Sequence, residues 1–221
     1  MRIEAKDLEF GYNNNNNKNI NNKNINKNNN KNKNKNIISR LSLTVDSHER
    51  TALIGPSGCG KSTLSHILAG NLKPQSGQVL IDNKPLPKHG FCPVQLICQH
   101  PEKAINPRWK LGKTLTEAWS PDAQFLEAMG IEKAWLNRYP VELSGGELQR
   151  FCIARALAPQ TSFIIADEMS TMLDMITQAQ IWQALLRIAD ERGLGLIAVT
   201  HSMELAKRVC SRVIEFESLM E

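Results

Sequence analysis

The sequence predicts an α/β fold with a parallel sheet at its core. Short apolar strand candidates alternate with helical stretches along most of the chain, which is the pattern of a parallel sheet covered by helices. One apolar strand, at residues 50–57, enters a glycine-rich turn that leads into a helix at 61–70. With 221 residues, 41% of them hydrophobic, the chain can bury a sizeable core as one large domain, or as one domain with a small lobe.

The remaining elements are expected in the same alternating order. The strand candidates are residues 2–10, 38–45, 50–57, 77–83, 94–99, 163–168, 194–200 and 212–216. Further helices are expected at 113–129 and 131–138. The segment of about 100–158 lacks clear strands, so it is expected to form a helical lobe. The sequence shows no internal repeat.

The basic charge of the chain comes from one segment. Residues Asn13 to Asn36 consist only of Asn, Lys and Ile, and their six lysines reduce the net charge of +5 to 5 − 6 = −1 for the rest of the chain. Two lone isoleucines cannot offset the entropy of ordering such a run, so it is predicted to be a disordered insertion. Two interpretations stay open: a passenger segment, or a basic arm for phospholipid or RNA.

Composition also bears on the cellular compartment. No apolar run approaches the roughly 18 residues that span a bilayer, and the first ten residues carry charges where a secretory signal has an apolar core. We therefore expect a cytoplasmic chain. The five cysteines are an odd number without a CxxC pair, which predicts free and mostly buried thiols.

The stretch GPSGCGKS, from Gly55 to Ser62, fits the phosphate-binding pattern GxxxxGK[ST] between an apolar strand and a helix. Successive backbone N–H groups of such a loop can surround a β-phosphate, and Lys61 can neutralise β- and γ-oxygens. The Ser62 hydroxyl is a candidate Mg²⁺ ligand, and Thr63 is placed for an α-phosphate. The other loop candidates are Gly55, Pro56, Ser57, Gly58, Cys59 and Gly60. A chance glycine-rich turn is disfavoured by the flanking strand and helix.

A second apolar strand, FIIADE at 163–168, ends in two carboxylates. Adjacent side chains on a strand point in opposite directions, so Asp167 and Glu168 can serve different roles. Asp167 is predicted to face Mg²⁺, and Glu168 to orient or deprotonate an attacking water near the γ-phosphate. A solvated acidic strand end is the alternative, which the phosphate-binding motif upstream weakens.

The stretch LSGGELQR, from Leu143 to Arg150, resembles the signature of ATP-binding cassette (ABC) ATPases, which is LSGGQ followed by a basic residue. With the other motifs in the family's order, the resemblance covers nearly the whole chain outside the Asn/Lys run. It implies a P-loop NTPase fold of ABC type: a parallel-sheet core, a small antiparallel β subdomain and an α-helical subdomain in a single nucleotide-binding domain. It also implies ATP and Mg²⁺ as cofactors.

The resemblance assigns roles to further residues. Tyr12 matches the aromatic that stacks on adenine, Gln99 the glutamine that senses Mg²⁺ and water, Asp174 the inter-subunit aspartate, and His201 the γ-phosphate histidine. Taken alone, Tyr12 could be an ordinary strand-end aromatic and His201 a surface histidine. The implied catalytic residues are therefore Glu168, His201 and Gln99, and the implied metal ligands are Ser62, Gln99 and Asp167.

The signature implies a partner subunit. Ser144, Gly145 and Gly146 begin a predicted helix whose N–H groups form a second anion-binding terminus. One chain has one P-loop and one signature, and in ABC ATPases these meet across a head-to-tail dimer of identical or paralogous subunits. Glu147 stands where the signature usually has Gln, and we expect this change near the ribose to be tolerated.

The stretch CQHPEKAINP, from Cys98 to Pro107, resembles a run in ATPases that serve peptide and nickel importers. It implies an ATPase subunit on the inner face of the membrane that powers a separate permease, with no nucleic acid as partner. Two other classes stay open. One is a soluble ABC ATPase that acts on ribosomes or in an enzyme assembly, and the other is a non-catalytic binding module, which the presence of Lys61, Glu168 and His201 disfavours. The sequence does not identify the solute.

Overall fold

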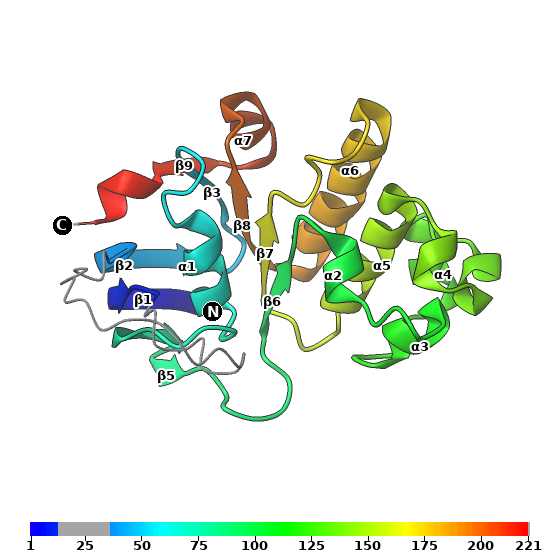
Figure 1. Ribbon diagram of the computed structural model, residues 1–221, viewed down its shortest axis with the longest axis horizontal. Helices are drawn as coiled ribbons and strands as arrows, with labels where there is room; N and C mark the ends of the chain where they lie inside the picture. The colour runs from blue at the N-terminus through cyan, green and yellow to red at the C-terminus, as the bar shows by residue number, and fades with distance from the viewer. Residues whose placement is uncertain (13–35, 221) are drawn as a thin grey trace, which may run out of the picture.

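The structure is a computed structural model that describes residues 1–12 and 36–220 (Figure 1). The predicted disordered insertion lies outside these residues, apart from Asn36, and stays a prediction. Two sheets lie beside each other, and a group of helices lies on the far side of the larger one. The α/β prediction is confirmed.

The larger sheet is entirely parallel and has the strand order β6-β7-β8-β3-β9. Its strands are β3 (Arg50–Ile54), β6 (Val94–Ile97), β7 (Phe163–Asp167), β8 (Gly195–Thr200) and β9 (Arg212–Glu215). Every residue of β7 and β8 is buried, because both faces of the sheet are covered. Their continuous apolar runs are therefore typical of central parallel strands.

The smaller sheet is antiparallel and has the order β2-β1-β4-β5. Its strands are β1 (Arg2–Phe10), β2 (Ile38–Asp46), β4 (Ser76–Ile81) and β5 (Lys84–Pro85). Buried and exposed residues alternate along much of β2, as expected for a strand with one face on a core. The backbone N–H of Ile37 donates to the Phe10 carbonyl at 2.8 Å. This bond holds the end of β1 next to the start of β2.

Seven α-helices are present in the described residues. They are α1 (Lys61–Leu68), α2 (Pro101–Ala104), α3 (Leu111–Thr116), α4 (Ala123–Ala128), α5 (Gly145–Ala156), α6 (Met175–Arg192) and α7 (Met203–Val209). Short 3₁₀ turns occur at Lys133–Asn137, Pro140–Glu142 and Phe216–Leu219. From β6 to β7 the chain forms helices, turns and loops, which gather at one end of the molecule (Figure 1).

The expected helix at 113–129 is wrong as one element. The structure has two short helices there, α3 and α4, with a break around Pro121. Proline has no N–H to donate and disfavours helical geometry in the residue before it. Asp122 then starts α4 by accepting a hydrogen bond from Phe125 N at 2.7 Å. The expected helix at 131–138 is also wrong, since that segment forms the 3₁₀ turn at Lys133–Asn137.

The described residues pack around two large apolar cores. One core lies between the sheets and contains residues of α1, such as Leu64, with Leu41 of β2 and Ile197 of β8. The other joins the helices to the opposite face of the parallel sheet, and includes Phe151 of α5 and Leu185 of α6. The parallel sheet is thus shared by both cores, and the strand ends that carry the site motifs lie between them.

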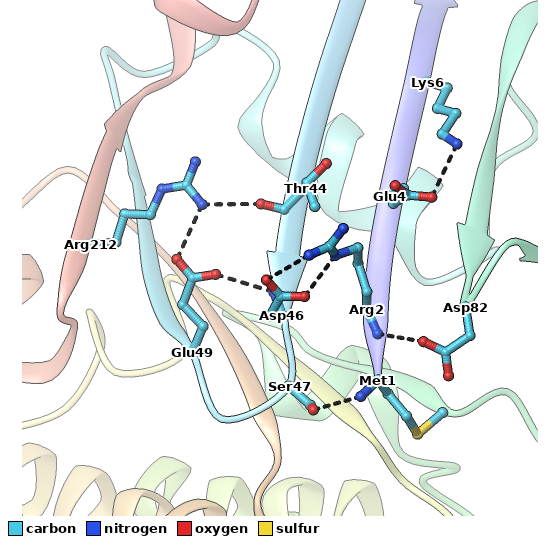
Figure 2. Close-up of polar contacts among 10 residues, drawn as sticks. All are labelled: Met1, Arg2, Glu4, Lys6, Thr44, Asp46, Ser47, Glu49, Asp82 and Arg212. Atoms are coloured by element: carbon cyan, nitrogen blue, oxygen red, sulfur yellow. Dashed lines mark hydrogen bonds and ion pairs between the residues drawn. The ribbon is translucent and has the colours of Figure 1, made fainter.

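Polar contacts fix the start of β1 between its neighbours (Figure 2). The Arg2 side chain donates to Asp46 of β2 at 2.7 Å, and its backbone N–H donates to Asp82 beyond β4 at 2.7 Å. Arg212 of β9 donates to Glu49 at 3.1 Å, which connects the parallel sheet to the turn after β2. Because these pairs are largely exposed, they contribute more to the alignment of the strands than to stability.

The cysteines are all free, as predicted. The expectation of mostly buried thiols is wrong, because Cys152 is buried and the other four are half-buried. Burial raises the pKa of Cys152 to about 12, so this thiol stays protonated at neutral pH. None of the helices in residues 1–12 and 36–220 has the length and apolar character needed to cross a bilayer.

Candidate functional site

The glycine-rich loop lies between the end of β3 and the start of α1. Gly60 has φ 119°, and a Cβ there would lie 2.8 Å from the Ile37 side chain and 3.1 Å from the Phe216 ring, so this position requires glycine. No side chain caps the first turn of α1. Its N–H groups can therefore bind an anion. Pro56, Ser57 and Gly58 are exposed, whereas Gly55 and Cys59 are half-buried.

Lys61 lies folded against its own loop. Its side chain is 5% exposed, and Nζ donates to the carbonyls of Gly55 and Pro56, both at 2.8 Å. The two carbonyls offset the cost of burying the ammonium group. The loop therefore holds a positive charge at its centre, where phosphate oxygens could replace the carbonyls as acceptors.

Asp167 ends β7 in a buried position and is 7% exposed. Its Oδ1 has no hydrogen-bond partner among the described residues. Burial raises the pKa of Asp167, and a hydrogen bond with the Ser62 side chain opposes this shift. A buried carboxylate oxygen without a partner, beside a hydroxyl, fits Mg²⁺, which binds oxygen ligands and often takes only one or two from a protein. No group of three or more His, Cys, Asp or Glu suited to a metal occurs within 1–12 and 36–220.

Glu168 follows Asp167 in an uncommon backbone conformation. Its φ of 47° turns the chain sharply at the end of β7, and its N–H donates to the Val199 carbonyl at 3.0 Å. Glu168 Oε1 lies 3.4 Å from His201 Nδ1. The fold thus brings together two of the three predicted catalytic side chains, from the ends of neighbouring strands.

Gln99 is connected to Glu168 by hydrogen bonds through Thr171. Gln99 Nε2 donates to Thr171 Oγ1 at 3.0 Å, and the Thr171 hydroxyl donates to the Glu168 carbonyl at 3.0 Å. Thr171 is not among the residues predicted from the sequence. A hydroxyl three residues after a strand-end carboxylate is a signal that could have found it, because such side chains often bond to nearby backbone groups.

Tyr12 lies beside the first turn of α1. Its hydroxyl is 3.5 Å from Thr63 Oγ1, and its ring packs edge-on against Phe10 with centroids 5.0 Å apart. The Tyr12 side chain is largely exposed. An exposed aromatic ring next to a phosphate-binding loop is available to stack on a base.

The signature forms the start of α5. Ser144 Oγ accepts from Glu147 N at 3.3 Å, and Glu147 Oε2 accepts from Ser144 N at 2.7 Å, which is a reciprocal capping box. Glu147 therefore stabilises the helix end, a role that the sequence analysis did not foresee. Gly146 lies against α6, since a Cβ there would be 2.8 Å from Thr177 Cγ2, and Gly145 faces open space.

A cavity of about 830 Å³ opens beside the signature. It is lined by the start of α5, by Leu173 and Asp174, and by one side of α6. Asp174 is the N-cap of α6, where its Oδ1 accepts from Ile176 N and Thr177 N at 3.0 Å each. A hydrogen bond with the Thr177 side chain, followed by these backbone bonds, lowers the pKa of Asp174. No residue of the 55–63 loop lines this cavity. The signature and the phosphate-binding loop are therefore separate surfaces of one chain.

Comparison with known proteins defines the class. A model of the ABC transporter family matches residues 38–171, and the chain belongs to this family. The nickel import ATP-binding protein NikE of Escherichia coli K12 is 32% identical, over 82% of this chain and 75% of that protein. NikE of Escherichia coli O157:H7 is also 32% identical, over the same shares of the two chains.

Solved structures agree with this assignment. The dimeric structure of MJ0796, a bacterial ABC transporter cassette, is 25% identical with a TM-score of 0.73, covering 96% of this chain and 93% of that one. The structure of cbiO1 from Clostridium perfringens, part of the ABC transporter complex cbiONQ, is similar in fold, with 22% identity, a TM-score of 0.70 and coverage of 96% and 83%. The chain is thus an ABC ATPase. In particular, it is the ATP-binding subunit of an ABC transporter, which confirms the family, the fold class and the activity predicted from the sequence.

Proposed function

We propose that this subunit powers a separate membrane permease of an importer for peptides, nickel or related solutes, from the cytoplasmic face of the membrane. The observation that carries the ATPase part is the convergence of Glu168, His201 and Gln99 at the end of β7, next to Asp167, whose Oδ1 has no partner in the part of the chain that the structure describes. The importer part rests on the likeness to nickel import proteins and on the Cys98–Pro107 stretch. We further propose that residues 1–221 act as one nucleotide-binding domain, with residues of about 100–158 as its helical subdomain.

In this proposal the loop and Tyr12 bind ATP. Tyr12 stacks on adenine, the N–H groups of the Gly55–Thr63 loop bind phosphate oxygens, and Lys61 exchanges its carbonyl partners for the β- and γ-oxygens. Ser62, Asp167 and Gln99 are the residues that would hold Mg²⁺. The bound ion supplies neutralisation of charge on the phosphate oxygens.

Glu168 is proposed as the general base. Its carboxylate takes a proton from a water whose oxygen attacks the γ-phosphorus, while the bond from that phosphorus to the bridging oxygen breaks and ADP leaves. His201, 3.4 Å from Glu168 Oε1, is placed to bind the γ-phosphate from the next strand end. Gln99 orients the attacking water, and its bond to Thr171 fixes the side chain beside the base.

A second ATPase subunit, identical or paralogous, completes each site in the proposal. The signature lies on a surface apart from the phosphate-binding loop of its own chain. Ser144, Gly145, Gly146 and Glu147 of one subunit would therefore contact the ATP that is bound by the loop of the other, with Asp174 at the interface. ATP-driven closure of this dimer would drive the permease.

Glu168→Gln tests the catalytic assignment. The amide keeps the shape of the side chain and loses its basicity, so the rate of phosphate release should fall by about 10²–10⁴. Calorimetry should show ATP affinity close to that of the original protein. Glu191→Gln, at an exposed position near the end of α6, is the matched control and should leave the rate unchanged. Near-normal turnover of Glu168→Gln would exclude Glu168 as the base.

The importer assignment has a separate test in the genome. Permease and solute-binding genes next to this gene would support it. A lone gene among translation factors would contradict it and favour the soluble ABC ATPases that act on ribosomes.

A further inference from the structure

Gln149 is a buried polar residue on a helix face that is otherwise apolar. It is 1% exposed, and Cys152 and Ile153, three and four residues later on the same face of α5, are also buried. Its Oε1 has no hydrogen-bond partner among the described residues. An unpaired buried oxygen opposes folding, so an apolar side chain of the same size would serve stability better. The amide must therefore have a use other than packing.

The other end of this amide bonds to the segment that leads to the site. Gln149 Nε2 donates to the Cys98 carbonyl at 3.4 Å. Cys98 follows the last residue of β6, so its carbonyl lies beyond the strand pairing of Ile97 with Ala166. The same peptide unit carries the nitrogen of Gln99. A side chain of α5 thus holds the backbone immediately before Gln99.

From there, two hydrogen bonds lead to the proposed base. Gln99 donates to Thr171, and Thr171 donates to the carbonyl of Glu168. Gln149 is also five residues after Ser144 on the same helix, a separation of about 7.5 Å along the axis. Three hydrogen bonds, linked through the covalent chain at Cys98 and Gln99, therefore connect α5 to the backbone of Glu168.

We propose that Gln149 is a positioning residue for ATP hydrolysis, which couples the signature helix to Gln99 and through Thr171 to Glu168. This inference rests on the proposed function, because it takes Glu168 and Gln99 as catalytic. When nucleotide binds at the start of α5, a shift of that helix moves the Cys98 carbonyl. Gln99 and the peptide of Glu168 then move with it. Contact with the signature of one subunit is in this way transmitted to the base in the same subunit.

Gln149→Met tests the inference, because Met has a similar length and cannot donate. The variant should fold at least as well, since it removes an unpaired buried oxygen, and a thermal melt checks this. Its kcat for ATP should fall by about tenfold, with KM within about twofold, because the bond orients the base and does not bind substrate. Thr171→Val, at an exposed position, should likewise lower kcat and leave KM nearly unchanged.

Two further variants separate positioning from packing. Thr114→Val removes an equally buried and unpaired hydroxyl from α3, which packs against α5 off the path, and should leave kcat unchanged. The double variant Gln149→Met with Thr171→Val should lose no more activity than the worse single variant, because both break one path.

The outcomes are distinct from those of the proposed function. An unchanged kcat in Gln149→Met, or losses that multiply in the double variant, overturns the coupling even when Glu168→Gln is inactive. If Glu168→Gln turns over normally, the proposed base is wrong, and the coupling to it fails with it.

Discussion

At the scale of single residues, the site contains two buried ionisable groups that differ in their hydrogen-bond partners. Lys61 Nζ has two carbonyl partners at 2.8 Å, whereas Asp167 Oδ1 has none among the described residues. Burial is the largest influence on Asp167, and it raises the pKa of that carboxyl. The Lys61 ammonium group therefore has hydrogen-bond acceptors, whereas one oxygen of the Asp167 carboxylate has no donor among the described residues. This difference is expected for a site that binds both a phosphate and a metal ion.

Asp167→Asn should stabilise the nucleotide-free protein while it damages activity. Because the folded-state pKa of Asp167 lies above its ordinary value of 3.8, its ionisation opposes folding as pH rises through the folded-state pKa. The variant should raise the melting temperature at pH 7, and this gain should vanish toward pH 4. Mg²⁺-dependent ATP hydrolysis should fall by about 10²-fold. Melting curves across pH and a phosphate-release assay measure both effects.

Asp174→Asn is the matched comparison, and its effect on the melting temperature should be opposite to that of Asp167→Asn. Accepted hydrogen bonds lower the pKa of Asp174, so its contribution to stability is present above pH 3.8 and is lost as pH falls through the folded-state pKa. This variant should lower the melting temperature at pH 7. If both variants shift the melting temperature in the same direction, the pKa assignment of Asp167 is wrong.

At the scale of elements, the ends of α5 and α6 are fixed by side chains from both helices. Ser144 and Glu147 cap the start of α5, and Asp174 caps the start of α6. The Arg192 guanidinium, at the end of α6, donates to the carbonyls of Leu157 and Ala158 just beyond α5, both at 2.7 Å. The two helices that flank the cavity beside the signature are thereby joined at the end away from it.

Arg192→Met should loosen this pair of helices. The change removes two charge-assisted hydrogen bonds to the carbonyls of buried residues, and the free energy of unfolding should fall by about 1–3 kcal/mol. Chemical denaturation measures this change. Arg187→Met, on the same helix, is the control, because the hydrogen bond from Arg187 to the Ala128 carbonyl is 3.5 Å long and exposed. An equal loss in both variants would show that general charge, and not the bonds of Arg192, stabilises the pair.

The sequence predicted the elements of the fold best where their structure depends on residues close together in the chain. The apolar runs of β7 and β8 and the motif at Gly55–Ser62 identify their own elements, because period, length and glycine positions are local properties. The break at Pro121 was also a local signal, and the helical pattern around it was given too much weight. The contact of Gln149 with Cys98 and that of Thr171 with Gln99 could not be found in this way, because the partners are 51 and 72 residues apart and only the fold brings them together.

At the scale of the whole molecule, the run of Asn, Lys and Ile lies in the connection between β1 and β2. Tyr12 and Ile37 are the residues on either side of it, and the bond from Ile37 N to the Phe10 carbonyl joins the strands just outside it. Because loop-closure entropy grows with the logarithm of length, an insertion there costs only on the order of 1 kcal/mol.

Replacing Asn13–Asn36 with a short Gly/Ser linker should leave the maximal ATPase rate and dimerisation unchanged. ATP affinity should be equal or slightly better, because the change is next to Tyr12 and away from the catalytic residues. Steady-state kinetics and light scattering in the presence of ATP measure these properties. Loss of transport or of partner binding would show that the segment is a working basic arm.

The bond between Ile37 and Phe10 also provides a place to attach a reporter. A peptide tag or a small fluorescent domain that replaces residues 13–36 would be attached to the fold at Tyr12 and Ile37, beside the hydrogen bond between Phe10 and Ile37. Because the Tyr12 hydroxyl lies 3.5 Å from Thr63, the reporter would stand at the edge of the nucleotide-binding loop. Its signal would then follow occupancy of that loop, whereas a label on the signature surface would be enclosed by the second subunit in the dimer proposed above.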